Sequence, residues 1–188
     1  MSEKKSYRLI NIAAILIVAM FFSCGNDIKE VQDFLAEKNL PIGAATNVHL
    51  IHTDSGMVKT ILTAPLMHDF SNREDHPYTL FPKGVRIVTF DKKGDSVILT
   101  AGYSITFSKT NISEVKDSVS VINPAEQTKL FTDQLFWDSN EHYIYTEKKF
   151  TLITKSDTIY GQGFESNEDL SQVNMKSIKG SVYLNETP

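Results

Sequence analysis

The amino-acid sequence predicts an all-β protein: a single antiparallel β-jellyroll, an open roll built from repeated strands, behind an N-terminal membrane-anchor segment. Two observations carry this prediction. From Asn47 onward, short runs rich in Val, Ile, Thr, Tyr and Phe are separated by turn residues such as Asp54-Ser55-Gly56, a pattern typical of all-β folds. One strand motif also recurs along the chain, which indicates stacked units. The 188 residues, 41% of them hydrophobic, suffice for one domain with its own core.

The first 23 residues predict a lipoprotein signal peptide or a signal anchor. Lys4, Lys5 and Arg8 precede an apolar segment at residues 9–22. This segment is short for a spanning helix, which needs roughly 20 apolar residues, but it suits an export signal. Ser23 directly before Cys24 resembles a bacterial lipobox, which implies cleavage before Cys24 and lipidation of its thiol. Both alternatives tether the rest of the chain to a membrane.

Charge and cysteine content restrict what holds the mature domain together. Residues 1–23 contain Lys4, Lys5, Arg8 and Glu3, so their removal changes the formal net charge from −4 to about −6. An acidic domain is not expected to bind nucleic acid or to be held on a membrane by basic residues. Because Cys24 is the only cysteine, no disulfide is predicted, and an ordinary core must stabilise the fold.

Residues 24–45 are predicted to form a tether, and residues 46–188 to form the β domain. Ile28, Val31, Phe34 and Leu35 have helical spacing, which indicates a short helix within the tether. Pro41 lies just beyond this segment.

Internal repetition is the strongest signal for the fold. The first strand of each unit resembles Ile-Leu-Thr-Ala, and a second short strand follows it. The first strands lie at residues 61–64, 98–101, 130–133 and 159–162, and the second strands at 85–88, 119–122, 150–153 and 182–184. No such unit can bury its apolar side alone, so we expect the units to stack.

The glycine pair Gly161 and Gly163 is the one feature that suggests a phosphate-binding loop. It belongs to the repeated strand, however, and residues 166–169 form a turn where a phosphate loop requires a helix. Glycines within a strand usually mark a bulge or a close backbone approach, and that is the interpretation we favour.

Catalytic and metal-binding interpretations have little support, so no enzyme, metal or cofactor is predicted. His49 and His52 are three residues apart, and on a strand such side chains point to opposite faces. Glu165, Glu168 and Asp169 are more typical of a solvated turn than of paired catalytic carboxylates. Lipidation of Cys24 would remove the only thiol, so no Cys-His pair is available.

Side-chain alternation directs one face of each predicted strand inward. The residues assigned to this inward face include Leu99, Tyr103, Ile105, Val119, Val121, Phe131, Leu135, Trp137, Phe150, Leu152, Tyr160 and Phe164. From the residues alone, such a face is either an ordinary packed core or the lining of a groove for acyl chains.

Three stretches of the C-terminal half resemble the lipopolysaccharide-transport β-jellyroll family that includes LptC, LptA and the N-terminal domain of LptD. They are "LFTDQLFWD" at residues 130–138, the strand at 145–152, and "GQGFESNEDL" at 161–170 with "MKSIKGSV" at 175–182. A single N-terminal anchor before one such domain resembles LptC more than the secreted LptA.

The resemblance implies a membrane-tethered protein on the periplasmic side of the inner membrane. It would receive lipopolysaccharide from the inner-membrane ABC transporter subunits and pass it to an LptA-like periplasmic jellyroll. The apolar face listed above, without Tyr160, would then be a lipid-binding trough. The chain has no G-x-x-x-x-G-K-[ST] loop, so ATP would be hydrolysed elsewhere.

Exposed edge strands of an open roll can pair with a partner strand. The predicted partner edge contains Ile178, Val182 and Leu184, and a second edge at residues 48–51 would face the membrane side. The alternative function is a structural envelope lipoprotein with a closed β core and no lipid cargo.

Overall fold

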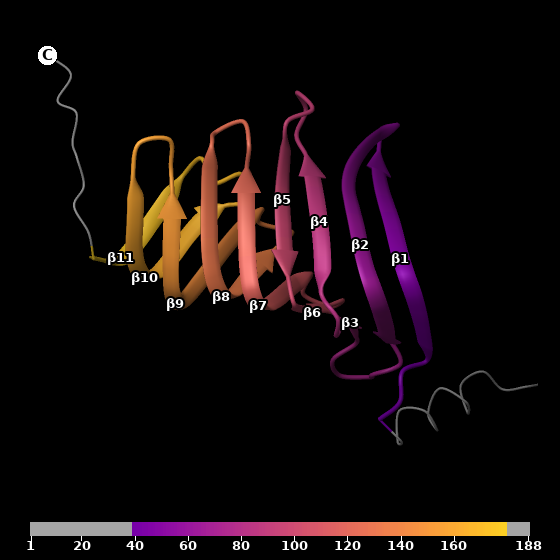
Figure 1. The fold of residues 1–188 in the computed structure, drawn as a ribbon. Coiled ribbons are helices and arrows are strands. Elements are labelled where there is room, and N and C mark those ends of the chain that lie inside the picture. Colours follow the sequence, from indigo (N-terminus) through magenta and orange to yellow (C-terminus); the bar gives the residue numbers. More distant parts are fainter. Residues whose placement is uncertain (1–38, 180–188) are drawn as a thin grey trace, which may run out of the picture.

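The computed structural model describes residues 39–179, which form one antiparallel sheet of eleven strands (Figure 1). The strands are β1 (Gly43–Asp54), β2 (Met57–Phe70), β3 (Tyr78–Phe81), β4 (Val85–Phe90), β5 (Ser96–Ala101), β6 (Tyr103–Phe107), β7 (Ile112–Asn123), β8 (Thr128–Asp138), β9 (Tyr143–Ile153), β10 (Thr158–Asn167) and β11 (Val173–Lys179). The prediction of an all-β roll is confirmed. The signal segment, Cys24 and the predicted tether helix lie outside the described residues, and β1 begins at Gly43 within the predicted tether.

The sheet folds over on itself into two layers, which we call the front and back layers after their positions in Figure 1. The front layer contains β4, β5 and the parts of β7, β8, β9 and β10 at residues 119–123, 128–132, 150–153 and 158–162. The back layer contains β3, β6 and the other halves of the long strands, at residues 112–116, 134–138, 143–146 and 164–167. The predicted repeat units at residues 85–88, 98–101, 119–122, 130–133 and 150–153 therefore build the front layer.

β-Bulges mark the points where the long strands change layer. The pairing register shifts between Lys116 and Val119, between Thr132 and Phe136, and between Gln162 and Phe164. Gly163 has a φ of 77° at the third shift, a backbone conformation that glycine adopts at low cost. These extra residues bend the strands and let one sheet supply both walls of the roll.

At the other side of the roll, β2 takes part in both layers. Residues 60–63 of β2 pair with β4, and residues 68–70 pair with β3. The back layer continues from β3 through β6 to β7. β1 pairs with β2 and lies at one edge of the sheet, and β11 pairs with β10 at the other.

The apolar core lies between the two layers. In the front layer, Val121, Leu130 and Leu152 are cross-strand neighbours on β7, β8 and β9, and each is at most 3% exposed. In the back layer, Val115 pairs with Leu135, and both are fully buried. Burial of each such side chain contributes about 1.5–3 kcal/mol, so these contacts hold the layers together without a disulfide.

Candidate functional site

The candidate site is the space between the layers, and most of the residues predicted to line it do face inward. Leu99, Val119, Val121, Leu135, Phe150, Leu152 and Phe164 are all buried members of one apolar cluster. Trp137 is partly buried and packs against that cluster. Cross-strand pairing makes the inner wall continuous from β5 through β7 and β8 to β9 and β10.

Four residues assigned to the inward face point outward instead, and Phe131 and Tyr160 are two of them. Phe131 is 39% exposed because its neighbours Leu130 and Thr132 face inward, and the bulge between Thr132 and Phe136 then turns Leu135 inward as well. Tyr160, also assigned to the inward face, is 55% exposed. The predicted inward orientation of these two side chains is therefore wrong.

Tyr103 and Ile105 are also on the outer face, on the back layer. Their neighbour Ser104 is the buried residue of β6 and pairs with Val115, whereas Ile105 pairs with Glu114. The chain bends at Gly102, whose N–H donates to the Asp117 carbonyl at 2.7 Å. This bend shifts the alternation by one residue, so the inward run of β5 does not continue into β6.

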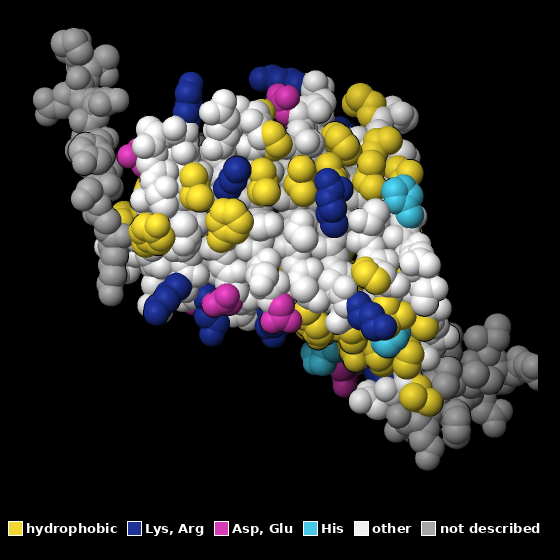
Figure 2. Space-filling model, viewed as in Figure 1, with side chains coloured by type: hydrophobic (Ala, Val, Ile, Leu, Met, Phe, Trp, Pro, Cys, Tyr) yellow, Lys and Arg dark blue, Asp and Glu magenta, His cyan; other side chains and the backbone are white. Residues whose placement is uncertain are grey.

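The outer face of the front layer also carries a row of apolar side chains, visible across the surface in Figure 2. The row consists of the cross-strand neighbours Ile51, Ile61, Val88, Ile98 and Ile122 on β1, β2, β4, β5 and β7. Cross-strand pairs of β-branched residues stabilise a sheet, so sheet stability accounts for this row.

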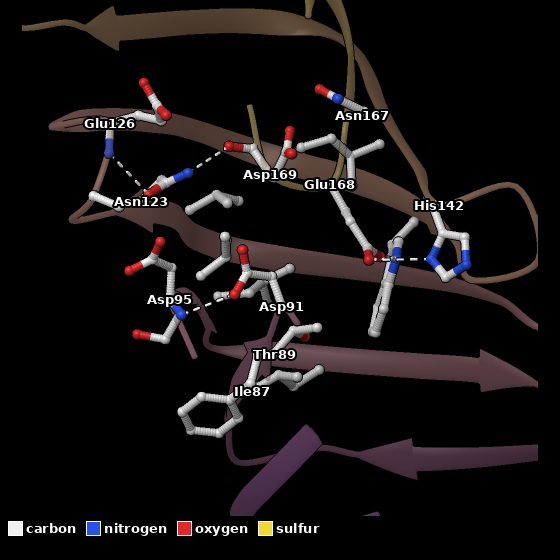
Figure 3. Close-up of a pocket in the computed structure, with 18 of the residues that line it drawn as sticks. Ile87, Thr89, Asp91, Asp95, Asn123, Glu126, His142, Asn167, Glu168 and Asp169 are labelled. Atoms are coloured by element: carbon white, nitrogen blue, oxygen red, sulfur yellow. Dashed lines mark hydrogen bonds and ion pairs between the residues drawn. The ribbon is translucent and has the colours of Figure 1, made fainter. Parts of the chain in front are cut away.

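The space between the layers opens to the outside in a cleft of ≈ 390 Å³. Its apolar floor is formed by Ile87, Leu99, Val121, Trp137 and Ile144, which come from both layers. The turns between β4 and β5, β7 and β8, β8 and β9, and β10 and β11 surround it (Figure 3). The cleft is therefore an apolar opening between the ends of the two layers, on the side of the roll opposite the β-bulges.

The rim of this cleft is polar and mostly acidic. Its carboxylates are Asp91, Asp95, Glu126, Glu168 and Asp169, and its basic groups include Lys93 and His142. Trp137 Nε1 donates to Glu168 Oε2 at 3.2 Å, and His142 Nδ1 lies 3.1 Å from Glu168 Oε1. The combination of an apolar floor and a charged rim suits an amphiphile, with its chain inside and its polar group outside.

Two residues of this region were not predicted from the sequence. Asn123 is 6% exposed, and its Nδ2 donates to the carbonyl of Asp169 at 2.7 Å (Figure 3). Leu170, in a segment predicted to be a solvated turn, is 4% exposed. Asn123 stands before Pro124 and signals a turn in the sequence, but nothing there indicates its contact with the β10–β11 turn.

The two edge strands of the sheet are β11 and β1. Ile178 is 45% exposed on the edge strand β11, whereas Val182 and Leu184 lie outside the described residues. At the opposite edge, β1 carries Leu50 and Ile51, which are 49% and 54% exposed. Both ends of the sheet thus present exposed apolar side chains beside edge backbone groups.

The carboxylates considered for catalysis have structural partners. Lys176 Nζ donates to Glu147 Oε1 at 2.6 Å and lies 3.1 Å from Glu165 Oε1. The hydrogen bond from Lys176, followed by one from Tyr143, lowers the pKa of Glu165 below its usual value. Glu168 is engaged by Trp137 and His142, and Asp169 Oδ1 accepts from the Ser171 N–H. These contacts order the surface and the turns.

Two further findings concern residues 39–179 alone. In that range, no three His, Cys, Asp or Glu side chains are grouped so as to hold a metal ion. No helix there is both long enough and apolar enough to cross a bilayer. His49 and His52, which the sequence analysis considered and rejected as metal ligands, are both exposed on β1.

The fold and the space between the layers define the class of this protein: it is a bent, two-layer β-jellyroll with an apolar interior that opens at one edge. A family model described as "Lipopolysaccharide-assembly, LptC-related" matches residues 12–183. The chain belongs to this LptC family. No curated protein matches the chain. Membership in this family indicates a role in lipopolysaccharide transport. It also indicates an envelope protein that is periplasmic and associated with the inner membrane. The family is not a known enzyme family.

Proposed function

We propose that this protein receives the acyl chains of lipopolysaccharide in the space between its layers and passes them to the next jellyroll. The observation that carries the proposal is the continuous apolar inner wall that reaches the surface at the cleft over Leu99, Val121 and Trp137. Family membership supplies the identity of the lipid.

Hydrophobic energetics explain why such a wall suits a carrier. Transfer of one CH₂ group from an apolar environment into water costs about 0.8 kcal/mol, so a lipid with several chains does not cross an aqueous gap unprotected. A continuous apolar trough keeps the chains dehydrated while the sugars remain in water. The acidic rim beside the cleft is compatible with a hydrated head group outside the wall.

The two edge strands support a position of this domain between two partner proteins. β11, with exposed Ile178, would add a strand from an LptA-like periplasmic jellyroll, and β1 would meet the inner-membrane ABC transporter subunits. Lipidated Cys24, or an uncleaved signal anchor, would hold the domain on the periplasmic side of the inner membrane. ATP hydrolysis would take place in the transporter.

A structural role with a closed core is the alternative, and one observation favours it. Val115, Leu130, Leu135 and Phe164 have no exposed surface in this conformation, so a lipid must separate side chains that are in contact. The two functions differ in whether the layers separate to admit a chain.

Native mass spectrometry of the full-length chain mixed with lipopolysaccharide tests the proposal. The matched variants are Leu99→Glu, at the cleft floor, and Ile98→Glu, on the opposite face of β5. We expect a lipid complex with the wild type and Ile98→Glu, and at least a tenfold loss with Leu99→Glu, since a charge in the trough excludes acyl chains. Circular dichroism establishes that both variants are folded. Absence of lipid from the wild type would favour the closed core.

A further inference from the structure

The β10–β11 turn, residues 168–172, lies beside the cleft and is hydrogen-bonded to the front layer by the Asn123 side chain. Asn123, the last residue of β7, donates from Nδ2 to the carbonyl of Asp169 at 2.7 Å (Figure 3). This hydrogen bond joins the end of a front-layer strand to a back-layer turn. It therefore spans the cleft from one layer to the other.

The orientation of Asn123 is fixed from both ends of its amide. Its Oδ1 accepts from the Glu126 N–H at 3.1 Å while its Nδ2 holds the turn. The side chain is 6% exposed, so its amide loses a buried partner when the layers separate. This hydrogen bond therefore holds the two layers together beside the cleft as long as no lipid lies between them.

Leu170 provides the apolar part of the same contact. Its φ is 61°, a left-handed conformation that is unfavourable for a bulky side chain. The side chain is nevertheless 4% exposed and belongs to the apolar cluster between the layers. Burial of Leu170 thus compensates for a strained backbone.

Internal hydrogen bonds give the turn a shape of its own. Asn167 Nδ2 donates to Ser171 Oγ at 2.8 Å, and Asn167 Oδ1 accepts from the Gln172 N–H at 2.9 Å. Asp169 Oδ1 accepts from the Ser171 N–H at 2.8 Å. None of these bonds involves the front layer, so the turn can leave Asn123 without losing its own structure.

We propose that this turn is a displaceable closure of the trough, and that Leu170 occupies the place of one linear acyl chain in the apolar cluster against which Trp137 packs. The inference deepens the proposed function and rests on it. An entering chain displaces Leu170 and breaks the bond between Asn123 and Asp169, after which the cleft continues into the space between the layers. Asn123 is a positioning residue that sets how readily the closure opens.

The single tryptophan of the chain, Trp137, gives a direct readout because it lines the cleft. The probe is a lysophosphatidylcholine with a dibrominated acyl chain, which quenches tryptophan on contact; its zwitterionic head group avoids repulsion by the acidic rim. The full-length chain is held in phosphatidylcholine vesicles, and the unbrominated lipid is the blank. We measure the rate at which Trp137 fluorescence is quenched.

We expect Asn123→Ala to accelerate quenching about fivefold, the effect of losing one hydrogen bond of ordinary strength. Leu170→Ala is expected to accelerate it as well, which keeps the test valid if Asn123→Ala does not fold. The control, Asn140→Ala, removes bonds to Asn111 and Thr110 within the back layer and should leave the rate unchanged.

The outcomes separate the two proposals. Quenching at equal rates in the wild type, Asn123→Ala and Leu170→Ala would overturn the closure while leaving acyl binding intact. No quenching in any of the folded proteins would contradict the acyl-binding trough itself, and the closure with it.

Discussion

Trp137 on β8 donates its indole N–H to Glu168 in the β10–β11 turn at 3.2 Å, although the two residues are 31 positions apart. The same carboxylate lies 3.1 Å from His142 Nδ1. Glu168 thus ties the cleft floor to its rim. Glu168, which lies in a segment predicted to be a solvated turn, thus orients Trp137, the aromatic side chain that an acyl chain would contact.

Removal of this carboxylate should loosen the cleft. Glu168→Ala leaves the indole N–H of a partly buried Trp137 without its acceptor, so we expect a loss of about 1 kcal/mol in the free energy of unfolding. Urea titration measures it, and the emission of Trp137 should shift to the red. Glu141→Ala, on an exposed residue of the neighbouring turn, is the control. Equal stability of the two variants would show that the Trp137–Glu168 bond contributes nothing.

Gly161 illustrates a close approach between elements. A Cβ at this position would lie 2.5 Å from the Ser177 carbonyl oxygen and 2.6 Å from the Phe150 ring, so neither strand nor core has room for it. We expect Gly161→Ala to lower the free energy of unfolding by about 1–3 kcal/mol. Gly43→Ala is the matched control, because its nearest neighbour, Asp69 Cβ, is 4.0 Å away. A loss below ~0.5 kcal/mol for Gly161→Ala would contradict this packing.

The Lys176 cluster predicts a dependence of stability on acid. The pKa of Glu165 is lowered from an ordinary value near 4.5, first by the hydrogen bond from Lys176. A lowered folded-state pKa adds stability above the unfolded-state pKa, and this stability disappears as the pH falls through the folded-state pKa. Glu165→Gln should therefore flatten the decrease in thermal midpoint below pH 4.5. If the thermal midpoint of Glu165→Gln decreases below pH 4.5 as steeply as that of the wild type, the stabilising role of the Glu165 carboxylate is contradicted.

The two edges should meet different proteins. A photo-crosslinking residue in place of Ile178 on β11 is expected to capture an LptA-like jellyroll. The same residue in place of Ile51 on β1 should capture a transporter subunit, because each side chain is about half exposed beside a free strand edge. Immunoblots of crosslinked cells identify the adducts. Capture of one partner from both positions would contradict the head-to-tail arrangement.

The sequence predicted the strands well because their signal is local. The repeats at residues 98–101 and 130–133 carry β-branched and aromatic residues between clear turns, and they form β5 and β8. The interpretation of Gly161 and Gly163 as a close approach and a bulge is confirmed by the contacts of Gly161 and the positive φ of Gly163.

Side-chain orientation was predicted less well because it depends on bulges. One extra residue reverses the face of every position that follows it. Because of the bulge in β8, Leu130 in the front layer and Leu135 in the back layer both face inward while Phe131 faces outward, and alternation alone does not locate this bulge. The burial of Leu170 was not predicted for another reason. It depends on contact between the β10–β11 turn and the front layer, which are far apart in the sequence.

In the proposed function, acyl chains of lipopolysaccharide occupy the space between the layers. The most direct measurement compares a benzophenone amino acid at Trp137, on the inner wall, with the same residue at Phe131, on the outer surface. Both substitutions replace one aromatic side chain with another in living cells. We predict a lipopolysaccharide adduct at position 137 that is lost when the transporter is depleted, and none at position 131. Equal adducts at both positions, or an adduct at position 131 alone, would contradict acyl binding between the layers.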